Sequence, residues 1–268
     1  MKKIIFYSAL LMLTAALFSC KKDECEDVVC KECVEYVKLK DGLIAYYKFD
    51  GNVADSSGRN NHGTIHGGLA YSTDKAGTAN SAAEFDGVDD YVIANETSNL
   101  SPAAITISAY YNTSSTEIQA LVNKRKDYTL NDAESNTGLS WSVNARSGIY
   151  EGFNAAQFGV VPNTGNCTTS AGINAEDLVY SMQSIQPNNW YHIVCIFDNG
   201  SERMYINGEL KHAITRPSTS LKQCTGGQLV IGSFVKGFPA FFKGKLDDLR
   251  IYDRALNEQE IAELAKEY

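Results

Sequence analysis

Two neighbouring stretches decide the fold of this chain: Trp190-Tyr191-His192-Ile193-Val194-Cys195-Ile196-Phe197 and Met204-Tyr205-Ile206-Asn207-Gly208-Glu209-Leu210. In the first stretch, both alternating sets of positions are apolar, which predicts a central β-strand buried on both faces. In the second, Asn207-Gly208 lies between two strand-like runs. Because both central positions of a type I′ turn need a positive φ, this pair predicts a two-residue β-hairpin.

The rest of the chain from Gly42 onward repeats this pattern of short apolar or alternating runs broken by Gly, Asn, Asp and Ser. Such spacing predicts a sandwich or a barrel of antiparallel β-strands. Near the end of the chain, Asn257 and Glu260 are spaced as a capping box, and an apolar stripe follows in a helix that extends to Tyr268. The expected strands are Leu43–Phe49, Ala82–Phe85, Tyr91–Ala94, Ile105–Tyr111, Leu139–Val143, Trp190–Phe197 and Leu229–Ile231.

Composition excludes several classes of protein. The chain has 268 residues, of which 44% are hydrophobic, so it can form a sizeable core, and its formal net charge is −8. An acidic protein repels the phosphate backbone, which argues against nucleic-acid binding. The distribution of the runs predicts one domain over residues 42–268.

The N-terminus predicts export and lipid attachment. Two lysines and an apolar run from Ile4 to Phe18 are typical of a signal peptide and too short for a membrane span. Leu17-Phe18-Ser19-Cys20 resembles the bacterial lipobox, in which the cysteine is acylated; an ordinary secretory signal is the alternative. We therefore expect a signal peptide over 1–19, a lipid on Cys20 and a charged tether over 20–41. The sequence after Cys20 resembles the export signal of Bacteroidetes-type lipoproteins, which implies an outer-membrane protein exposed at the cell surface.

Seven cysteines raise the question of disulfides and metals. Cys25, Cys30 and Cys33 lie in the tether; no histidine precedes His62, so a local disulfide is expected in preference to zinc. Cys167 and Cys224 lie in loop-like segments, and a bridge between them would contribute about 4 kcal/mol in the chain-entropy model. Cys195 lies on the predicted buried strand and is expected to be a packed free thiol.

Four blocks of sequence together resemble one family, the laminin-G-like (LamG-like) jelly roll of the concanavalin A-like lectin/glucanase superfamily. The resemblance implies a two-sheet antiparallel jelly-roll sandwich whose relatives mostly bind carbohydrates or proteins. The chain departs from the family pattern over 145–189. The blocks are Leu43–Gly51 with Asp55–Gly63, Phe85–Val92, Trp190–His192 with Tyr205–Gly208, and Phe242–Leu256.

The same resemblance implies a structural calcium ion. Asp50 and Asp55 frame a turn rich in Gly, Asn and Ser, whose oxygens suit a hard cation. The family pattern assigns Asp55, Asn61, Asp247 and Asp248 as ligands. The alternative is a plain turn in which the side chain of Asp55 bonds nearby backbone groups.

Two aromatic clusters are candidate ligand contacts. Tyr150, Phe153 and Phe158 lie in the 145–189 insert, where a sugar ring could stack on them. Phe238, Phe241 and Phe242 form a second group. The alternative for both groups is that the rings pin long loops to the sandwich.

Three histidines are read as structural. His192 lies on the predicted central strand and is expected to be a hydrogen-bonded core residue. His62 and His66 lie in a Gly-rich loop, where bonds to backbone are expected and a transition-metal pair is the alternative.

One stretch favours an enzyme. Glu84-Phe85-Asp86-Gly87-Val88-Asp89 resembles the catalytic strand of laminarinase-type glycosidases, which need two carboxylates on one strand face. However, Asp86-Gly87 has the character of a turn that ends the strand. The sequence therefore predicts a lipid-anchored, non-catalytic protein that binds glycan or protein ligands. A glycoside hydrolase and a structural or adhesion protein of the envelope remain as alternatives.

Overall fold

The structure is a computed structural model that describes residues 39–96, 100–126, 138–146, 149–161, 178–222, 226–234 and 238–266, with the backbone alone at 149 and 150. Several predictions lie outside these residues. They are the signal peptide over 1–19, the acylation of Cys20, the tether up to residue 38 with Cys25, Cys30 and Cys33, and the Cys167–Cys224 bridge.

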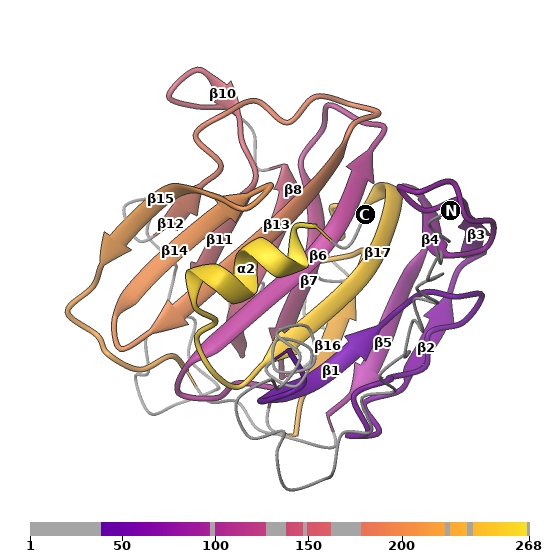
Figure 1. Cartoon of the computed structure of the whole chain (residues 1–268). Helices are drawn as coiled ribbons and strands as arrows, with labels where there is room; N and C mark the ends of the chain where they lie inside the picture. The colour runs from indigo at the N-terminus through magenta and orange to yellow at the C-terminus, as the bar shows by residue number, and fades with distance from the viewer. Residues whose placement is uncertain are drawn as a thin grey trace, which may run out of the picture.

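The described strands form two facing antiparallel sheets, as the sequence predicts (Figure 1). The front sheet has the order β15-β14-β13-β6-β17-β4-β3, with β1 also paired to β17; the back sheet has the order β12-β11-β8-β7-β16-β5-β2. The strands of the two sheets and of a small separate hairpin, β9–β10, have the following bounds: β1 Leu43–Tyr47, β2 Gly63–His66, β3 Ala70–Ser72, β4 Ala82–Asp86, β5 Tyr91–Asn95, β6 Ile105–Thr113, β7 Gln119–Arg125, β8 Leu139–Arg146, β9 Ile149–Tyr150, β10 Phe153–Asn154, β11 Gln157–Val160, β12 Leu178–Tyr180, β13 Trp190–Asp198, β14 Ser201–Ile206, β15 Glu209–Thr215, β16 Gln228–Ile231 and β17 Lys243–Tyr252.

The central strand β13 is buried on both faces, because both alternating sets of its side chains are mostly apolar. Ile193 and Cys195 point into the core between the sheets, whereas Val194 and Ile196 point to the other side and pack beneath the helix α2. Cys195 is fully buried and free, which confirms the prediction. Strands such as β5, with Val92 and Ala94, contribute alternate residues to the core in the same way.

The Asn-Gly hairpin is confirmed. Asn207 and Gly208 have φ values of 52° and 82°, and they join β14 to β15 in antiparallel register. All seven strands expected from the apolar runs are present within a few residues of their predicted ends. The insert over 145–189 differs from expectation, because it contributes β11 and β12 to the back sheet.

The helix α2, Glu258–Leu264, lies across the outer face of the front sheet (Figure 1). Its capping box is confirmed, since the side chain of Asn257 accepts from the amide of Glu260 and the side chain of Glu260 accepts from that of Asn257. The helix ends before Tyr268, the predicted end. Within the described residues, none of the helices has the length and apolar character needed to cross a bilayer.

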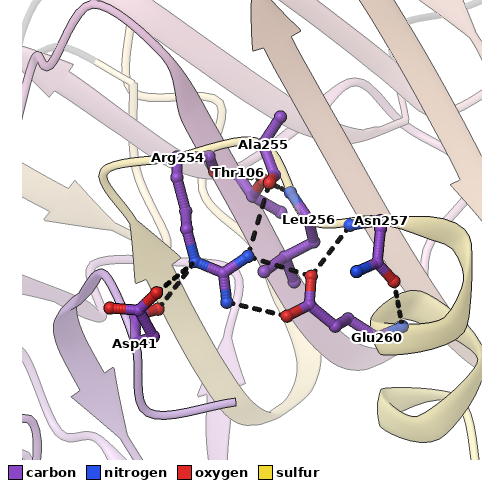
Figure 2. A network of polar contacts seen from close by, with 7 residues as sticks. All are labelled: Asp41, Thr106, Arg254, Ala255, Leu256, Asn257 and Glu260. Atoms are coloured by element: carbon purple, nitrogen blue, oxygen red, sulfur yellow. Dashed lines mark hydrogen bonds and ion pairs between the residues drawn. The ribbon is translucent and has the colours of Figure 1, made fainter. Parts of the chain in front are cut away.

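A network around Arg254 joins this helix to the start of the domain (Figure 2). The guanidinium donates two 2.9 Å hydrogen bonds to the carboxylate of Glu260, and its Nε donates to the carbonyl oxygen of Asp41 at 2.9 Å. Thr106 of β6 donates to the carbonyl oxygen of Arg254 at 2.7 Å. The network therefore holds Asp41 against the segment that leads from β17 into α2.

Candidate functional site

The front sheet is interrupted at one point along β17. The first half of β17 pairs with β4 through residues 243–246, and the second half pairs with β1 through residues 249–252. Asp247 and Asp248 lie between these two ladders, where the register with β6 also shifts. Asp248 has a φ of 48°, which is rare for a residue other than glycine and turns its side chain out of the strand alternation.

A hollow of about 290 Å³ opens at this interruption. We call it the acidic depression, because four carboxylates line it: Asp50, Asp74, Asp247 and Asp248. They come from the loop after β1, the β3–β4 loop and the bulge in β17. The hydroxyl groups of Thr78 and Ser81 add further oxygen atoms.

Local hydrogen bonds hold these carboxylates in place. Asp74 Oδ1 accepts from the amide of Thr78 at 2.8 Å, and Asp247 Oδ1 accepts from the amide of Asp248 at 2.7 Å. Asp248 Oδ1 accepts from the hydroxyl of Tyr46 at 2.5 Å and lies 3.4 Å from Arg250 Nη2. Asp247 is 1% exposed and Asp74 9%. This density of oxygen ligands suits Ca²⁺, which takes six to eight of them.

Two of the four predicted calcium ligands are not in the acidic depression. The carboxylate of Asp55 accepts from the amides of Tyr46, Ser57 and Asn61 at 2.8 to 3.0 Å and from the hydroxyl of Ser57. The side chain of Asn61 is fully buried and donates to the carbonyl oxygen of Ile44 at 2.9 Å. Their assignment as ligands alongside Asp247 and Asp248 is therefore wrong: Asp55 organises its own turn, as the alternative reading held.

A second acidic cluster is formed by Asp86, Asp89 and Asp90, whose carboxylate oxygens all lie within 4.8 Å of one another. Hydrogen bonds of the β4–β5 turn account for its geometry. Asp86 Oδ1 accepts from the amide of Val88 at 2.7 Å, and Asp90 Oδ2 accepts from the amide of Asp86 at 2.9 Å. Asp86 and Asp89 are exposed. The cluster shapes the turn.

Three aromatic rings stack on the outer face of the back sheet, which is the face turned away from the core. Val92 of β5 points into the core, so its neighbour Tyr91 points outward. The ring centroids of Tyr91 and His66 lie 4.5 Å apart, and the two rings are 4° from parallel. The ring of Phe241 also stacks on that of Tyr91, with a centroid distance of 6.3 Å. All three are half-buried. We call this group the ring stack.

Polar side chains lie on the same outer face, at the end of β5 opposite to the ring stack. Asn95 follows Tyr91 on β5, and Gln228 of β16 donates to its Oδ1 at 3.4 Å. On β7, the side chain of Asn123 is fully buried and its amide nitrogen donates to the carbonyl oxygen of Ser233. Of these amides, Asn95 is exposed and Gln228 is half-buried, so these two can contact a ligand and Asn123 cannot.

The aromatic residues predicted to bind ligand are separated by the structure. Phe158 is fully buried in the core between the sheets, so its prediction as a ligand contact is wrong. Phe153 is half-buried on β10, and the side chain of Tyr150 lies outside the described residues. In the second predicted group, Phe242 is a core residue, Phe241 joins the ring stack and Phe238 is 50% exposed.

His192 on β13 is a buried residue, and its surroundings determine its charge state. His192 Nε2 lies 2.9 Å from the hydroxyl of Ser108, and its ring stacks on Tyr110. Burial, together with the nearby charges of Arg250 and Lys75, lowers the pKa of His192 to about 3. His192 is thus the neutral core histidine that the sequence predicts.

The carboxylates considered for glycoside hydrolysis lie on the outer face of the front sheet, in a hollow of about 550 Å³. Glu84 is paired across the strands with Lys245, and Asp86 with Lys243. Gly87, which follows Asp86, has a φ of 78°, so the strand ends in a turn at this point. Each carboxylate therefore faces a lysine on the neighbouring strand.

Comparison of the sequence with protein families finds one match over most of the domain. The model described as the concanavalin A-like lectin/glucanases superfamily (Laminin_G_3) matches residues 86–262. No curated protein sequence matches the chain.

Solved structures with the same fold are numerous. Domain 4 of AbnA, an extracellular arabinanase from Geobacillus stearothermophilus solved with arabinotriose, is 22% identical with a TM-score of 0.60, covering 84% of this chain and 98% of that one. The binding domain of botulinum neurotoxin serotype D, solved with N-acetylneuraminic acid, is 14% identical with a TM-score of 0.62. That match covers 87% of this chain and 52% of the neurotoxin domain.

Proposed function

Because the chain belongs to the concanavalin A-like lectin/glucanases superfamily, we propose that it is a non-catalytic domain that binds carbohydrate. The observation that carries this proposal is the ring stack of His66, Tyr91 and Phe241 on the outer face of the back sheet. The fold itself admits both enzymes and binding domains, so the proposal depends on this site.

The chemistry of the ring stack suits a saccharide. A pyranose or furanose ring has an apolar face of C–H groups and a rim of hydroxyls. The apolar face packs on an aromatic ring, which removes both surfaces from water. A longer oligosaccharide that runs along β5 would also reach the amides of Asn95 and Gln228, which lie about 13 Å along the strand from Tyr91.

Two similar structures support a saccharide ligand. The arabinanase domain was solved with arabinotriose and the neurotoxin domain with N-acetylneuraminic acid. At these identities the likeness extends to the fold alone, so arabinan and sialylated oligosaccharides are starting probes.

The test first selects a ligand on a glycan array and then compares how two aromatic residues contribute to its binding. The full-length chain is screened, and the best-bound oligosaccharide is then titrated into the unmodified chain, Tyr91→Ala and Phe153→Ala by calorimetry. We expect Tyr91→Ala to weaken binding by roughly tenfold to a hundredfold, the loss of one ring contact. Phe153→Ala is the matched control, since it removes a half-buried ring from the insert.

Two results would contradict the proposal. If no glycan binds, while pull-down from envelope or host extracts captures a protein, the domain is an adhesion module. If Phe153→Ala abolishes binding and Tyr91→Ala does not, the glycan site lies in the insert.

The non-catalytic part of the proposal is supported by Glu84 and Asp86, each of which faces a lysine across the strand pair. A retaining glycosidase needs its two carboxylates about 5–5.5 Å apart and free to act as nucleophile and acid. Release of reducing ends from a bound glycan, abolished in the double variant Glu84→Ala/Asp86→Ala, would show instead that the protein is a hydrolase.

We also propose that the acidic depression holds a structural calcium ion. Asp50, Asp74, Asp247 and Asp248 would be its protein ligands, and the ion would tie the loops after β1 and β3 to the bulge of β17. Its role is to hold three separate segments against mutual repulsion of their carboxylates.

Finally, we propose that the domain is attached by a lipid on Cys20 to the outer membrane and faces the cell exterior. The support is the sequence around Leu17-Phe18-Ser19-Cys20 and the charged tether that follows. Labelling of the unmodified protein with palmitate, lost in Cys20→Ala, tests the anchor. Digestion of the protein by protease added to intact cells tests the orientation; a protected protein would place it on the inner leaflet side.

A further inference from the structure

A pocket on the outer side of β1 has a charge opposite to that of the protein as a whole. It has a volume of about 400 Å³ and is lined by three cationic side chains, Lys40, Lys48 and Arg250. Ser56 and Ser57 contribute hydroxyl groups and Tyr46 forms one wall. We call it the basic pocket. Among the described residues that line it, none is acidic.

The cations of this pocket differ in how firmly they are held. Arg250 is 8% exposed, stacks over the ring of Tyr46 at 4.4 Å and donates to its hydroxyl at 2.8 Å. Lys40 and Lys48 are exposed, with Lys48 Nζ 5.7 Å from the same ring. Arg250 also lies 3.4 Å from the carboxylate of Asp248, which holds it from one side. Guanidinium and ammonium groups are common partners of phosphate oxygens in proteins.

The net charge of −8 makes this local arrangement informative. A strongly acidic protein repels anions over most of its surface, so three cations around one hollow do not follow from the average composition. The hydroxyl of Ser56 adds a donor of the kind that contacts phosphate oxygens. Ser56 is fixed by its amide, which donates to the carbonyl oxygen of Tyr46 at 2.7 Å.

We propose that the basic pocket binds a phosphate group. Arg250 and Lys48 would pair with its charge, and Ser56 would donate to one of its oxygens. The apolar wall formed by Leu39 and Leu43 suits the carbon chain of a phosphate ester better than a free ion.

The position of the pocket points to a source for the phosphate. Leu39 and Lys40 line it and belong to the last residues of the expected tether over 20–41. The clamp of Arg254 on Asp41 fixes this entry point on the sandwich (Figure 2). A domain joined to a membrane at this end would present the basic pocket to phospholipid headgroups, and a phosphorylated glycan is the other source of the same chemistry.

The basic pocket and the acidic depression share two walls, Tyr46 and Lys48. The hydroxyl of Tyr46 links them, because it donates to Asp248 and accepts from Arg250. A cation in the acidic depression would neutralise Asp248 and so strengthen the pull of Arg250 on an anion. Phosphate is therefore expected to bind more tightly when calcium is present.

The experiment measures binding of inorganic phosphate to the full-length chain in neutral detergent by calorimetry, with and without calcium. We expect saturable binding that weakens about tenfold in Lys48→Gln, the loss of one charge-assisted contact. Lys126→Gln is the matched control, because this exposed lysine lies at the end of β7, on the other sheet. Lys126→Gln should leave the melting temperature unchanged. Lys48→Gln also removes a cation from the wall of the acidic depression, so circular dichroism checks that this variant keeps its β-structure.

Further ligands separate the sources. Glycerol 3-phosphate that binds more tightly than glucose 1-phosphate assigns the pocket to a lipid headgroup, and the reverse order assigns it to a phosphorylated glycan. The proposal is overturned if inorganic phosphate does not bind, if Lys48→Gln and Lys126→Gln weaken binding equally, or if galacturonate binds better than every phosphate.

Discussion

The outer faces of the two sheets differ in what covers them. On the front sheet, Val194 and Ile196 are buried beneath α2 together with Ile261 and Leu264 of the helix. On the back sheet, the outer face carries the half-buried ring stack and amide side chains. The same strand alternation produces both faces. One is closed by α2, and the other carries half-buried rings at β2 and β5 next to fully buried side chains such as Asn123 and Val230.

This difference separates stability from recognition. Burial of apolar surface under α2 contributes to folding and leaves nothing for a ligand to contact. A half-buried ring contributes less to folding and keeps a surface that a ligand can cover. Changes on the front sheet should therefore alter the free energy of unfolding, and changes at the ring stack should alter glycan affinity.

The largest effect is expected in the helix that covers the front sheet. Ile261→Ala removes a fully buried side chain and should lower the free energy of unfolding by about 3 kcal/mol through lost burial and the cavity left behind. Urea denaturation measures the loss. Glycan affinity of the folded fraction should be unchanged, and a parallel loss of affinity would show that the two faces are coupled.

The covered face should also make stability depend on pH. The pKa of His192 is about 3 in the folded chain against an ordinary value of 6.5, because the ring is buried. Below pH 6.5 the unfolded chain therefore binds a proton that the folded chain does not, so stability falls as pH drops from about 6.5 toward 3. Between pH 7 and pH 5 this group alone should cost about 2 kcal/mol.

Urea denaturation of His192→Gln at several pH values checks this expectation. The variant loses the titrating group, so its stability should vary less with pH over that range than that of the unmodified chain. Equal slopes in the two proteins would mean that His192 is accessible to water in the folded state.

A calcium-dependent effect of intermediate size is expected at the interruption of the front sheet. Calcium at a hundred times its dissociation constant would add about 2.7 kcal/mol to stability. The melting temperature should therefore rise on adding calcium and fall with chelator, and Asp247→Asn should remove most of the difference. Asp89→Asn is the control, as this exposed residue lies in the separate β4–β5 turn. A melt indifferent to calcium in the unmodified chain would exclude the ion.

The smallest effect is expected at the edge of the ring stack. Phe241→Leu keeps an apolar side chain against Tyr91 and removes only the ring stacking, so glycan affinity should fall by roughly threefold to tenfold. Calorimetry against the array ligand measures the change. A larger loss than that of Tyr91→Ala would move the centre of the site toward the β16–β17 loop.

The sequence predicts those features that depend on neighbours along the chain. Asn207-Gly208 sets the hairpin through the φ values of two residues, and Asn257 with Glu260 sets the start of α2 within one turn. The alternation of β13 predicts correctly which residues face each layer. These signals are local, so a single stretch carries each of them.

The sites depend on contacts between distant segments, and prediction from sequence was weaker there. Asp50 and Asp74 reach the acidic depression from two loops, and the resemblance to the family selected Asp55 in their place. Phe158 is expected to be a loop aromatic because it lies in the Gly/Asn/Ser/Thr-rich insert, but pairing with β8 and β12 turns it into the core. The three rings of the ring stack come from distant segments of the chain, so no spacing within one stretch of sequence predicts that they meet.

The most direct test of the account is where a bound glycan lies. The oligosaccharide selected on the array is fitted with a photoreactive diazirine and crosslinked to the full-length chain, and the labelled peptides are mapped by mass spectrometry. We predict intact saccharide attached within residues 63–66, 91–95 and 228–241, around the ring stack. Labels confined to the front sheet and α2, or a saccharide recovered cleaved, would contradict the account.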